Sequence, residues 1–257
     1  MLGHHDLILE QFTRQAVPFS TAPGIRDEDA LRLLVECSGA GPTETVLDVA
    51  CGPGLVVAAF ARMCRHVTGI DLTPAMIERA RTLAAERGLD NVTLAVGDVL
   101  PLPYADDAFS VVVSRFAFHH FPDPRAVLRE MARVCRPGGR VVVADAAASL
   151  DPAKAAAFNR MEKLRDPSHV RALSLPELMT LFADAGLGEP AITRYALPAD
   201  LDGLLSRSFP APGDADEIRA VFQDSLGADG LGVGAHEREG RIHFAYPIAI
   251  LAAARGA

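Results

Sequence analysis

The stretch Val46-Leu47-Asp48-Val49-Ala50-Cys51-Gly52-Pro53-Gly54 decides the fold predicted for this chain. It begins as a short apolar run, which is typical of a buried strand. It continues as a turn of small residues, and an apolar stretch at helical spacing follows from Leu55 to Ala61. A strand, a glycine turn and a helix bring the backbone of an α/β protein close to a nucleotide-like ligand. A dinucleotide-binding G-x-G-x-x-G motif would need its third glycine at Leu55, so the pattern disfavours that class.

Composition narrows the class of protein further. The chain has 257 residues, of which 49% are hydrophobic and 23% charged, enough for one large α/β domain with an elaboration. A net charge of −8 with scattered acidic residues disfavours a nucleic-acid partner, which would require a basic face. No apolar run approaches the roughly 20 residues of a membrane span, and the first residues do not resemble a signal peptide. We therefore expect a soluble, cytoplasmic protein with no membrane span.

Acidic residues follow the next two predicted strands. The strand at 66–71 ends in Asp71, and a carboxylate in this position can accept both hydroxyls of a ribose. Thr73 and Pro74 are a natural N-cap and first residue for the helix that follows. The strand at 91–96 leads into Gly97-Asp98-Val99. An acid there could bind an adenine amino group.

The fourth predicted strand leads into a loop that is rich in histidine. Phe109–Val113 reads as a buried central strand because of its β-branched residues, and it ends in the loop Ser114–Phe121. Open α/β sheets place their ligands at this carboxyl end of the strands. A helix at 124–135, a structural Pro-Gly-Gly turn and a strand at 141–144 follow.

The flanks of this core are less regular. Residues 1–40 predict two helical segments, 6–12 and 26–37, separated by a loop that holds Pro18 and Phe19. This arm is either a covering helix or a lid over the cofactor. We expect an N-terminal arm at 1–40, a core at 41–148 and a C-terminal part at 149–257 with a helical cap inserted at about 199–240. The C-terminal part predicts helices at 154–165, 174–185, 200–207 and 214–226, and strands at 191–197 and 243–253.

Several segments together resemble a known family. Residues 46–54, 98–124 and 131–139 are similar to class I S-adenosylmethionine (SAM) dependent methyltransferases, in the small-molecule branch that includes the ubiquinone/menaquinone C-methyltransferases. The resemblance covers about residues 44–148. It implies an α/β, Rossmann-like, seven-stranded and mostly parallel sheet with its last strand antiparallel, helical lid segments, and SAM as cofactor. Ala50 departs from the family, which more often has glycine there, but a methyl group leaves room for the cofactor.

The resemblance also implies a set of cofactor-binding residues. Each part of SAM has its own members: Asp48, Ala50 and Gly52 for the methionine part, Asp71 for the ribose, Leu72 and Met76 for the adenosine, Asp98 and Val99 for the adenine, and the backbone of Ser114 or Arg115 for the amino-acid moiety, with Gly54 and Gly97 completing the set.

Catalysis of methyl transfer requires few protein groups. Methyl transfer is an in-line displacement, so a base is needed only when the acceptor must lose a proton. His119 and His120 are the candidate catalytic bases, although either could instead pack or orient the loop. Arg115 could bind an anionic acceptor or, as we prefer, pair with an acid in the loop. Asp145 lacks partners at metal-binding spacing, so we expect no metal.

The sequence leaves open which molecule accepts the methyl group. Aromatic and Met residues in the flanks favour a small, partly apolar acceptor, but they could equally form the core of the cap. These residues are Phe12, Phe19, Phe116, Phe158, Met161 and Phe209. Alternatives are a SAM-binding protein without transferase activity, a repurposed pocket such as a cyclase, and, less favoured, a nucleic-acid methyltransferase or an NAD-binding module. The acceptor atom and the oligomeric state stay open, a homodimer being one option.

Overall fold

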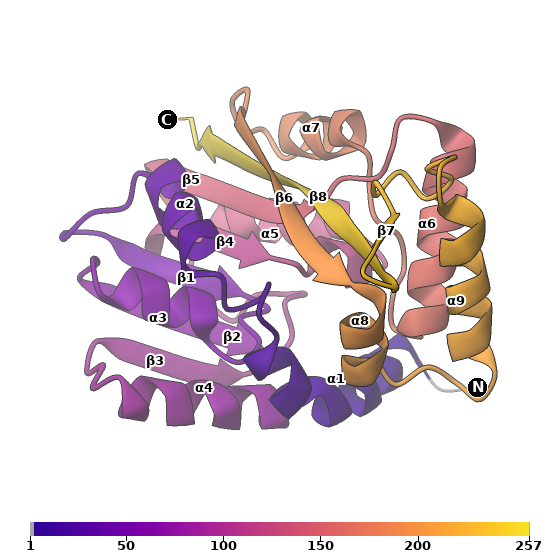
Figure 1. The fold of residues 1–257 in the computed structure, drawn as a ribbon. Helices are drawn as coiled ribbons and strands as arrows, with labels where there is room; N and C mark the ends of the chain where they lie inside the picture. The colour runs from indigo at the N-terminus through magenta and orange to yellow at the C-terminus, as the bar shows by residue number, and fades with distance from the viewer. Residues whose placement is uncertain (1–2, 257) are drawn as a thin grey trace.

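The computed structural model describes residues 3–256, which form an α/β fold around one mixed sheet (Figure 1). Seven strands follow the order β3-β2-β1-β4-β5-β8-β6, and a short eighth strand, β7, pairs only with β8. The strands are β1 (Thr45–Val49), β2 (His66–Asp71), β3 (Val92–Val96), β4 (Phe109–Arg115), β5 (Cys135–Ala146), β6 (Ala191–Asp200), β7 (His236–Arg238) and β8 (Arg241–Ala254).

The direction of the strands confirms the predicted fold class. β1 to β5 pair in parallel, whereas β8 runs antiparallel to both β5 and β6. The last strand of the chain is therefore antiparallel, as the family resemblance implies, and it lies between β5 and β6. β7 extends the prediction, because it forms a hairpin with the beginning of β8.

Helices cover both faces of the sheet because successive residues of each strand point to opposite faces. Leu47 of β1 packs with α5 and α7, while the adjacent Val46 packs with α2 and α3. The helices are α1 (His4–Thr21), α2 (Glu28–Ser38), α3 (Leu55–Ala61), α4 (Pro74–Glu86), the 3₁₀ turn η1 (Phe118–His120), α5 (Pro124–Val134), α6 (Pro152–Arg165), α7 (Leu175–Asp184), α8 (Leu201–Arg207) and α9 (Asp214–Ser225).

A third apolar cluster lies beyond the carboxyl end of the sheet. It joins α6, α8 and α9 to the first half of β8, and α6 and α9 stand side by side (Figure 1). Helix α7 begins with a capping box, since Ser174 N and Oγ both donate to Glu177. The predicted helices and the two predicted strands of this part are present, and only the short β7 was not predicted.

One prediction about the N-terminal arm is wrong. Pro18 and Phe19 do not lie in a loop, because α1 continues through them to Thr21. Pro18 removes only one helical hydrogen bond in the last turn, and the helix ends three residues later. The arm therefore begins as one long helix rather than a short helix and a loop.

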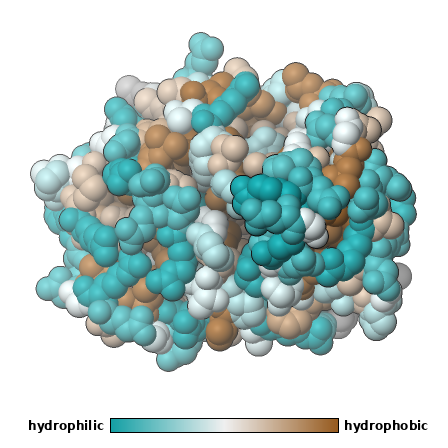
Figure 2. Space-filling model, viewed as in Figure 1, coloured by the Kyte–Doolittle hydropathy of each residue, from teal (hydrophilic) through white to brown (hydrophobic). Residues whose placement is uncertain are grey.

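Figure 2 shows that hydrophobic residues on this face of the molecule are scattered among hydrophilic ones. Within residues 3–256, no helix combines the length and the hydropathy that a membrane crossing would require.

Candidate active site

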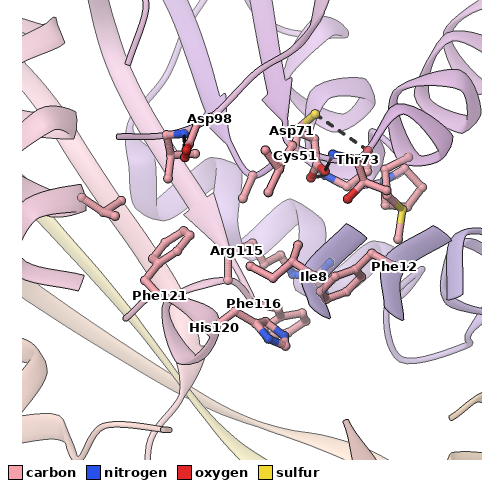
Figure 3. Close-up of a pocket in the computed structure, with 18 of the residues that line it drawn as sticks. Ile8, Phe12, Cys51, Asp71, Thr73, Asp98, Arg115, Phe116, His120 and Phe121 are labelled. Carbon is pink, nitrogen blue, oxygen red and sulfur yellow. Dashed lines mark hydrogen bonds between the residues drawn. The ribbon is translucent and has the colours of Figure 1, made fainter. Parts of the chain in front are cut away.

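A cavity of about 220 Å³ lies at the carboxyl ends of β1, β2 and β4. Figure 3 shows Asp71, Thr73 and Asp98 on one side of it and the aromatic residues Phe12, Phe116 and Phe121 on the other. Helix α1 closes part of this cavity, with Ile8 and Phe12 pointing inward. The predicted cofactor residues that line the cavity are Ala50, Gly52, Asp71, Leu72, Met76, Asp98, Val99 and Arg115.

The turn after β1 has left-handed backbone at three positions. Ala50, Gly52 and Gly54 have φ of 57°, 52° and 81°. Glycine adopts this region without penalty, whereas an alanine is strained there. The conformation of Ala50 gives a physical reason why the family more often has glycine at this position. Gly54 also allows α3 to approach α4, because a Cβ there would lie 2.8 Å from Ala80 Cβ.

Asp71 is held rigidly at the end of β2. Its Oδ2 accepts a hydrogen bond from Gly52 N at 2.8 Å, and its Oδ1 accepts one from Thr73 N at 2.9 Å. Burial raises the pKa of Asp71, and these backbone donors oppose that effect. These two hydrogen bonds fix the carboxyl group across the glycine turn, where Asp71 lines the cavity.

Asp98 lies on the wall after β3. Its Oδ1 accepts hydrogen bonds from Val99 N at 2.6 Å and Leu100 N at 3.2 Å. Its Oδ2 lies 3.5 Å from His5 Nε2 of α1. The N-terminal helix therefore contacts the predicted adenine-binding acid directly.

Four predicted cofactor residues do not line the cavity. Ser114 is fully buried and donates from Oγ to Val49 O at 2.9 Å. Gly54 packs against Ala80, and Gly97 lies beside Ile70. Asp48 is 1% exposed, and burial, followed by the charge of Asp71, raises its pKa well above the usual value. These four residues lie behind those that line the cavity.

The expected ion pair of Arg115 with a loop acid is wrong. Within the part of the chain that the structure describes, its Nη1 donates to Ile25 O at 2.9 Å and no carboxylate lies within ion-pair distance. The guanidinium lies over the Phe116 ring at 4.2 Å, and its Nε and Nη2 have no partner. Burial lowers the pKa of Arg115. Ile25, in the N-terminal arm, supplies the carbonyl partner instead.

A second cavity of about 160 Å³ adjoins the first. It lies among α1, α6, α8 and the middle of β8, with Asp145 at the end of β5. Five residues line both cavities, and they therefore form the boundary between them: Phe12, Phe19, Ile25, Phe116 and His120.

His119 and Asp145 form a hydrogen-bonded pair in the second cavity. His119 Nδ1 lies 2.6 Å from Asp145 Oδ1, and the same carboxylate accepts from Ala146 N at 2.7 Å and His119 N at 3.3 Å. A carboxylate only accepts, so the proton of a neutral His119 resides on Nδ1 and Nε2 carries the lone pair. Burial alone would lower the pKa of His119, but the charge and hydrogen bond of Asp145 raise it above the usual value.

His120 has a different environment. It is 6% exposed, with Phe12 packed edge-on against it at 5.0 Å and Ser168 Oγ 3.2 Å from its Nδ1. Burial, and next the charge of His119, lower the pKa of His120 to about 3. The pKa values of the two adjacent histidines are therefore shifted in opposite directions, and His120 stays neutral at neutral pH.

Sequence reasoning missed the polar residues that α6 and β8 bring into the second cavity. Glu162 accepts from Arg165 Nη2 at 2.6 Å and from Tyr246 Oη at 2.8 Å. Asp166 accepts from Ser168 Oγ at 2.5 Å, and His169 is 1% exposed. Glu162 and Arg165 lie on a helix that the sequence predicted. Helical spacing alone does not show which groups surround a buried charged side chain.

The predicted apolar residues divide between the cavities and the core. Phe12, Phe19, Phe116 and Phe158 line the cavities. Met161 is fully buried in the cluster formed by α6, α8 and α9, and Phe209 is 36% exposed on the surface. Among the described residues, no group of His, Cys, Asp and Glu side chains is arranged to hold a metal ion.

Comparisons with known proteins agree with this geometry. Residues 47–143 match the family described as "Methyltransferase domain". The chain is 32% identical over 231 residues to the uncharacterized methyltransferase YcgJ of Bacillus subtilis, covering 85% of this chain and 91% of that protein. The crystal structure of YcgJ aligns with a TM-score of 0.83 at 28% identity, covering 90% of this chain and 99% of that one.

Two further relatives are also methyltransferases by name. A putative methyltransferase structure from Bacillus halodurans C-125 has a TM-score of 0.83 at 26% identity, over 89% of this chain and all (100%) of that one. A demethylmenaquinone methyltransferase of Halalkalibacterium halodurans is 40% identical over 102 residues, covering 38% of this chain and 42% of that protein. The relative that spans most of both sequences, together with the sheet order, establishes the family: the chain belongs to the class I SAM-dependent methyltransferases.

Proposed function

We propose that this methyltransferase transfers the methyl group of SAM to a small, partly apolar acceptor held in the second cavity. One observation carries the proposal: the cavity beside the glycine turn and the cavity beside the His119–Asp145 pair share a wall. Cofactor in the first and acceptor in the second would meet at that boundary. Aromatic side chains on the boundary suit an acceptor with an apolar body.

The residues around the first cavity fit SAM. Asp71 offers a fixed carboxylate for the ribose hydroxyls, and Asp98 lies after the neighbouring strand for the adenine. Leu72, Met76 and Val99 provide apolar contacts for the adenosine. In this proposal Ala50 and Gly52 adjoin the methionine part, and Asp48 supports them from behind. Residues 1–40 act as the lid, because α1 lines both cavities.

When bound, SAM would supply a sulfonium methyl group, which passes to the acceptor as the sulfur is displaced in line. The protein aligns the acceptor and, in this proposal, removes its proton through His119. His119 suits this role because Asp145 fixes its tautomer and leaves Nε2 as the acceptor. His120, which adjoins both cavities and stays neutral, fits a role in orienting the loop and dividing the cavities.

Calorimetry followed by turnover tests the proposed function. We expect the protein to bind SAM and its demethylated product, S-adenosylhomocysteine, and to bind NAD much more weakly. Turnover of labelled SAM on a panel of small hydroxy, amino, thiol and carbon acceptors should then give methylated product. Binding without transfer on any member would favour a SAM-binding protein or a repurposed pocket, and preferential binding of NAD would refute the cofactor site.

Asp71→Ala should weaken SAM binding by roughly 1–3 kcal/mol, because hydrogen bonds to the ribose are lost. That corresponds to about a 5- to 150-fold higher Kd by calorimetry. Asp90→Ala, an exposed acid outside the cavity lining, is the matched control and should leave Kd unchanged. Equal affinities in all three proteins, with thermal unfolding confirming that Asp71→Ala is folded, would remove Asp71 from the site.

A further inference from the structure

His169 is held in one tautomer by Asn159. His169 Nε2 lies 2.8 Å from Asn159 Oδ1, and the same oxygen accepts from Ala172 N at 2.6 Å. Asn159 Nδ2 donates to Ala155 O at 3.0 Å, so both ends of the amide have fixed orientations. Because the amide oxygen only accepts, His169 Nε2 must carry a proton.

The other ring nitrogen of His169 is left without a donor. Burial, and next the charge of His119, lower the pKa of His169 to about 4, so the ring is neutral at neutral pH and Nδ1 carries a lone pair. Within residues 3–256, no group hydrogen-bonds to this buried Nδ1. A buried acceptor without a donor destabilises the protein, and a ligand that supplies the donor recovers that free energy on binding.

A second imidazole lone pair belongs to the same cavity. Asp145 holds the His119 proton on Nδ1, and His119 Nε2 has no hydrogen-bond partner among the described residues. The His119 and His169 rings both line the second cavity, and their centroids are 5.5 Å apart. The polar end of the cavity is thus lined by two neighbouring imidazole rings, each with a nitrogen that lacks a donor, and its other walls include the aromatic rings of Phe12, Phe116 and Phe158.

The carboxylates near these rings already accept hydrogen bonds from neighbouring protein groups. Glu162 is occupied by Arg165 and Tyr246, and Asp166 by Gln15 and Ser168. Asp145 is occupied by His119 and Ala146. The His119 Nε2 and His169 Nδ1 atoms, in contrast, accept no hydrogen bond from the residues that the structure describes.

We infer that the methyl acceptor carries two hydrogen-bond donors at one end of an apolar body, and that His169 selects for the second donor. This inference rests on the proposed function and adds a substrate class to it. The first donor, an O–H or N–H group, gives its proton to His119 Nε2. Its heteroatom bonds to the methyl carbon, and the carbon–sulfur bond breaks with its electron pair remaining on sulfur. The second donor stays hydrogen-bonded to His169 Nδ1 and orients the molecule.

This arrangement would discriminate strongly between acceptors. A site built to bind a donor rejects an analogue that lacks it, because its buried acceptor is then left unpaired. An acceptor with a single donor would leave either His119 or His169 unsatisfied. His169 is therefore a specificity-determining residue in this inference, whereas Asn159 is a positioning residue that acts through the tautomer.

A ligand-and-variant cycle tests the inference with catechol and phenol as probes. Both have the same apolar ring, but catechol has two adjacent donors and phenol has one. His169→Gln retains a donor toward Asn159 and has no acceptor in the position of Nδ1, whereas His169→Asn retains an acceptor there. Calorimetry on protein saturated with S-adenosylhomocysteine would measure the affinity of each probe for the wild type and both variants.

We expect the wild type to bind catechol about tenfold more tightly than phenol, the ratio that one hydrogen bond supplies. The ratio should fall to about one in His169→Gln and recover in His169→Asn. Nitrogen NMR should show His169 Nδ1 unprotonated in the free protein and shifted by catechol more than by phenol. Equal ratios in the wild type and His169→Gln would overturn the inference while leaving the proposed function intact.

Two other outcomes would contradict the proposed function or the acceptor cavity. Failure of all three proteins to bind S-adenosylhomocysteine would overturn the proposed function itself. Normal binding of S-adenosylhomocysteine without binding of either probe would overturn the acceptor cavity and, with it, the role of His169. Because the cofactor analogue is measured in the same samples, a variant that fails to fold is recognised by its loss of that binding.

Discussion

His119→Ala is expected to lower kcat by about 10²–10⁴-fold at saturating SAM, the usual contribution of a general base. The residue lines the cavity proposed for the acceptor, and its Nδ1 donates to Asp145, so its Nε2 is available for an incoming proton. The Kd of SAM should change little, because His119 does not line the first cavity. His236→Ala, an exposed histidine elsewhere, provides the control. A kcat within about twofold of wild type would leave alignment as the source of catalysis.

The pH profile distinguishes a base from a merely structural histidine. The pKa of His119 is raised by Asp145, so the ring is protonated below that pKa and cannot accept a proton. The rate should therefore rise with pH, with a midpoint above the ordinary histidine value of about 6.5. Asp145→Asn removes the charge, and burial then dominates, so the midpoint should move to lower pH. An unchanged midpoint in Asp145→Asn would exclude His119 as the titrating base.

Acidification from about pH 7.5 to about pH 5 is expected to lower the free energy of unfolding by up to about 4 kcal/mol. His120 and His169 have folded-state pKa values of about 3 and about 4, and both are buried. In the unfolded chain both titrate near 6.5, so the unfolded state binds more protons across this range. Each contributes stability that is present above the unfolded pKa and is lost as pH falls, about 2 kcal/mol by about pH 5.

His119 opposes this loss, since its raised pKa gives stability that is fully present below about pH 6.5 and is lost as pH rises through the folded-state value. Urea denaturation at the two pH values measures the net effect. The double variant His120→Asn/His169→Asn lacks both titrating groups, so its stability should depend much less on pH, whatever its absolute value. The same pH dependence in the wild type and the double variant would contradict this explanation.

The strands and most helices could be predicted because their signals are local. Alternation of apolar residues, the Thr73-Pro74 start of α4 and the Ser174 capping box each act over a few residues. The extension of α1 through Pro18 could not be predicted in this way. Proline usually marks a helix end, but here Phe12 packs edge-on against Phe19 and Gln15 donates to Asp166. The first contact joins the two halves of α1, and the second links the helix to the segment after α6.

The sequence by itself indicated the methyl donor, because residues 46–54, 98–124 and 131–139 resemble a family that uses SAM. The glycine turn, Asp71 and Asp98 each follow a parallel strand, and such strand ends meet at one edge of the sheet. Tertiary structure alone decided the geometry of the second cavity. Asp145 lies on β5, Asn159 and Glu162 on α6, His169 in the loop after α6, and Tyr246 on β8. Only tertiary packing brings these residues together around His119. A hydrogen-bond network between distant segments leaves no periodic pattern along the chain, so the turn Asp48–Gly54 indicates the donor, and the residues that would select the acceptor become visible only in three dimensions.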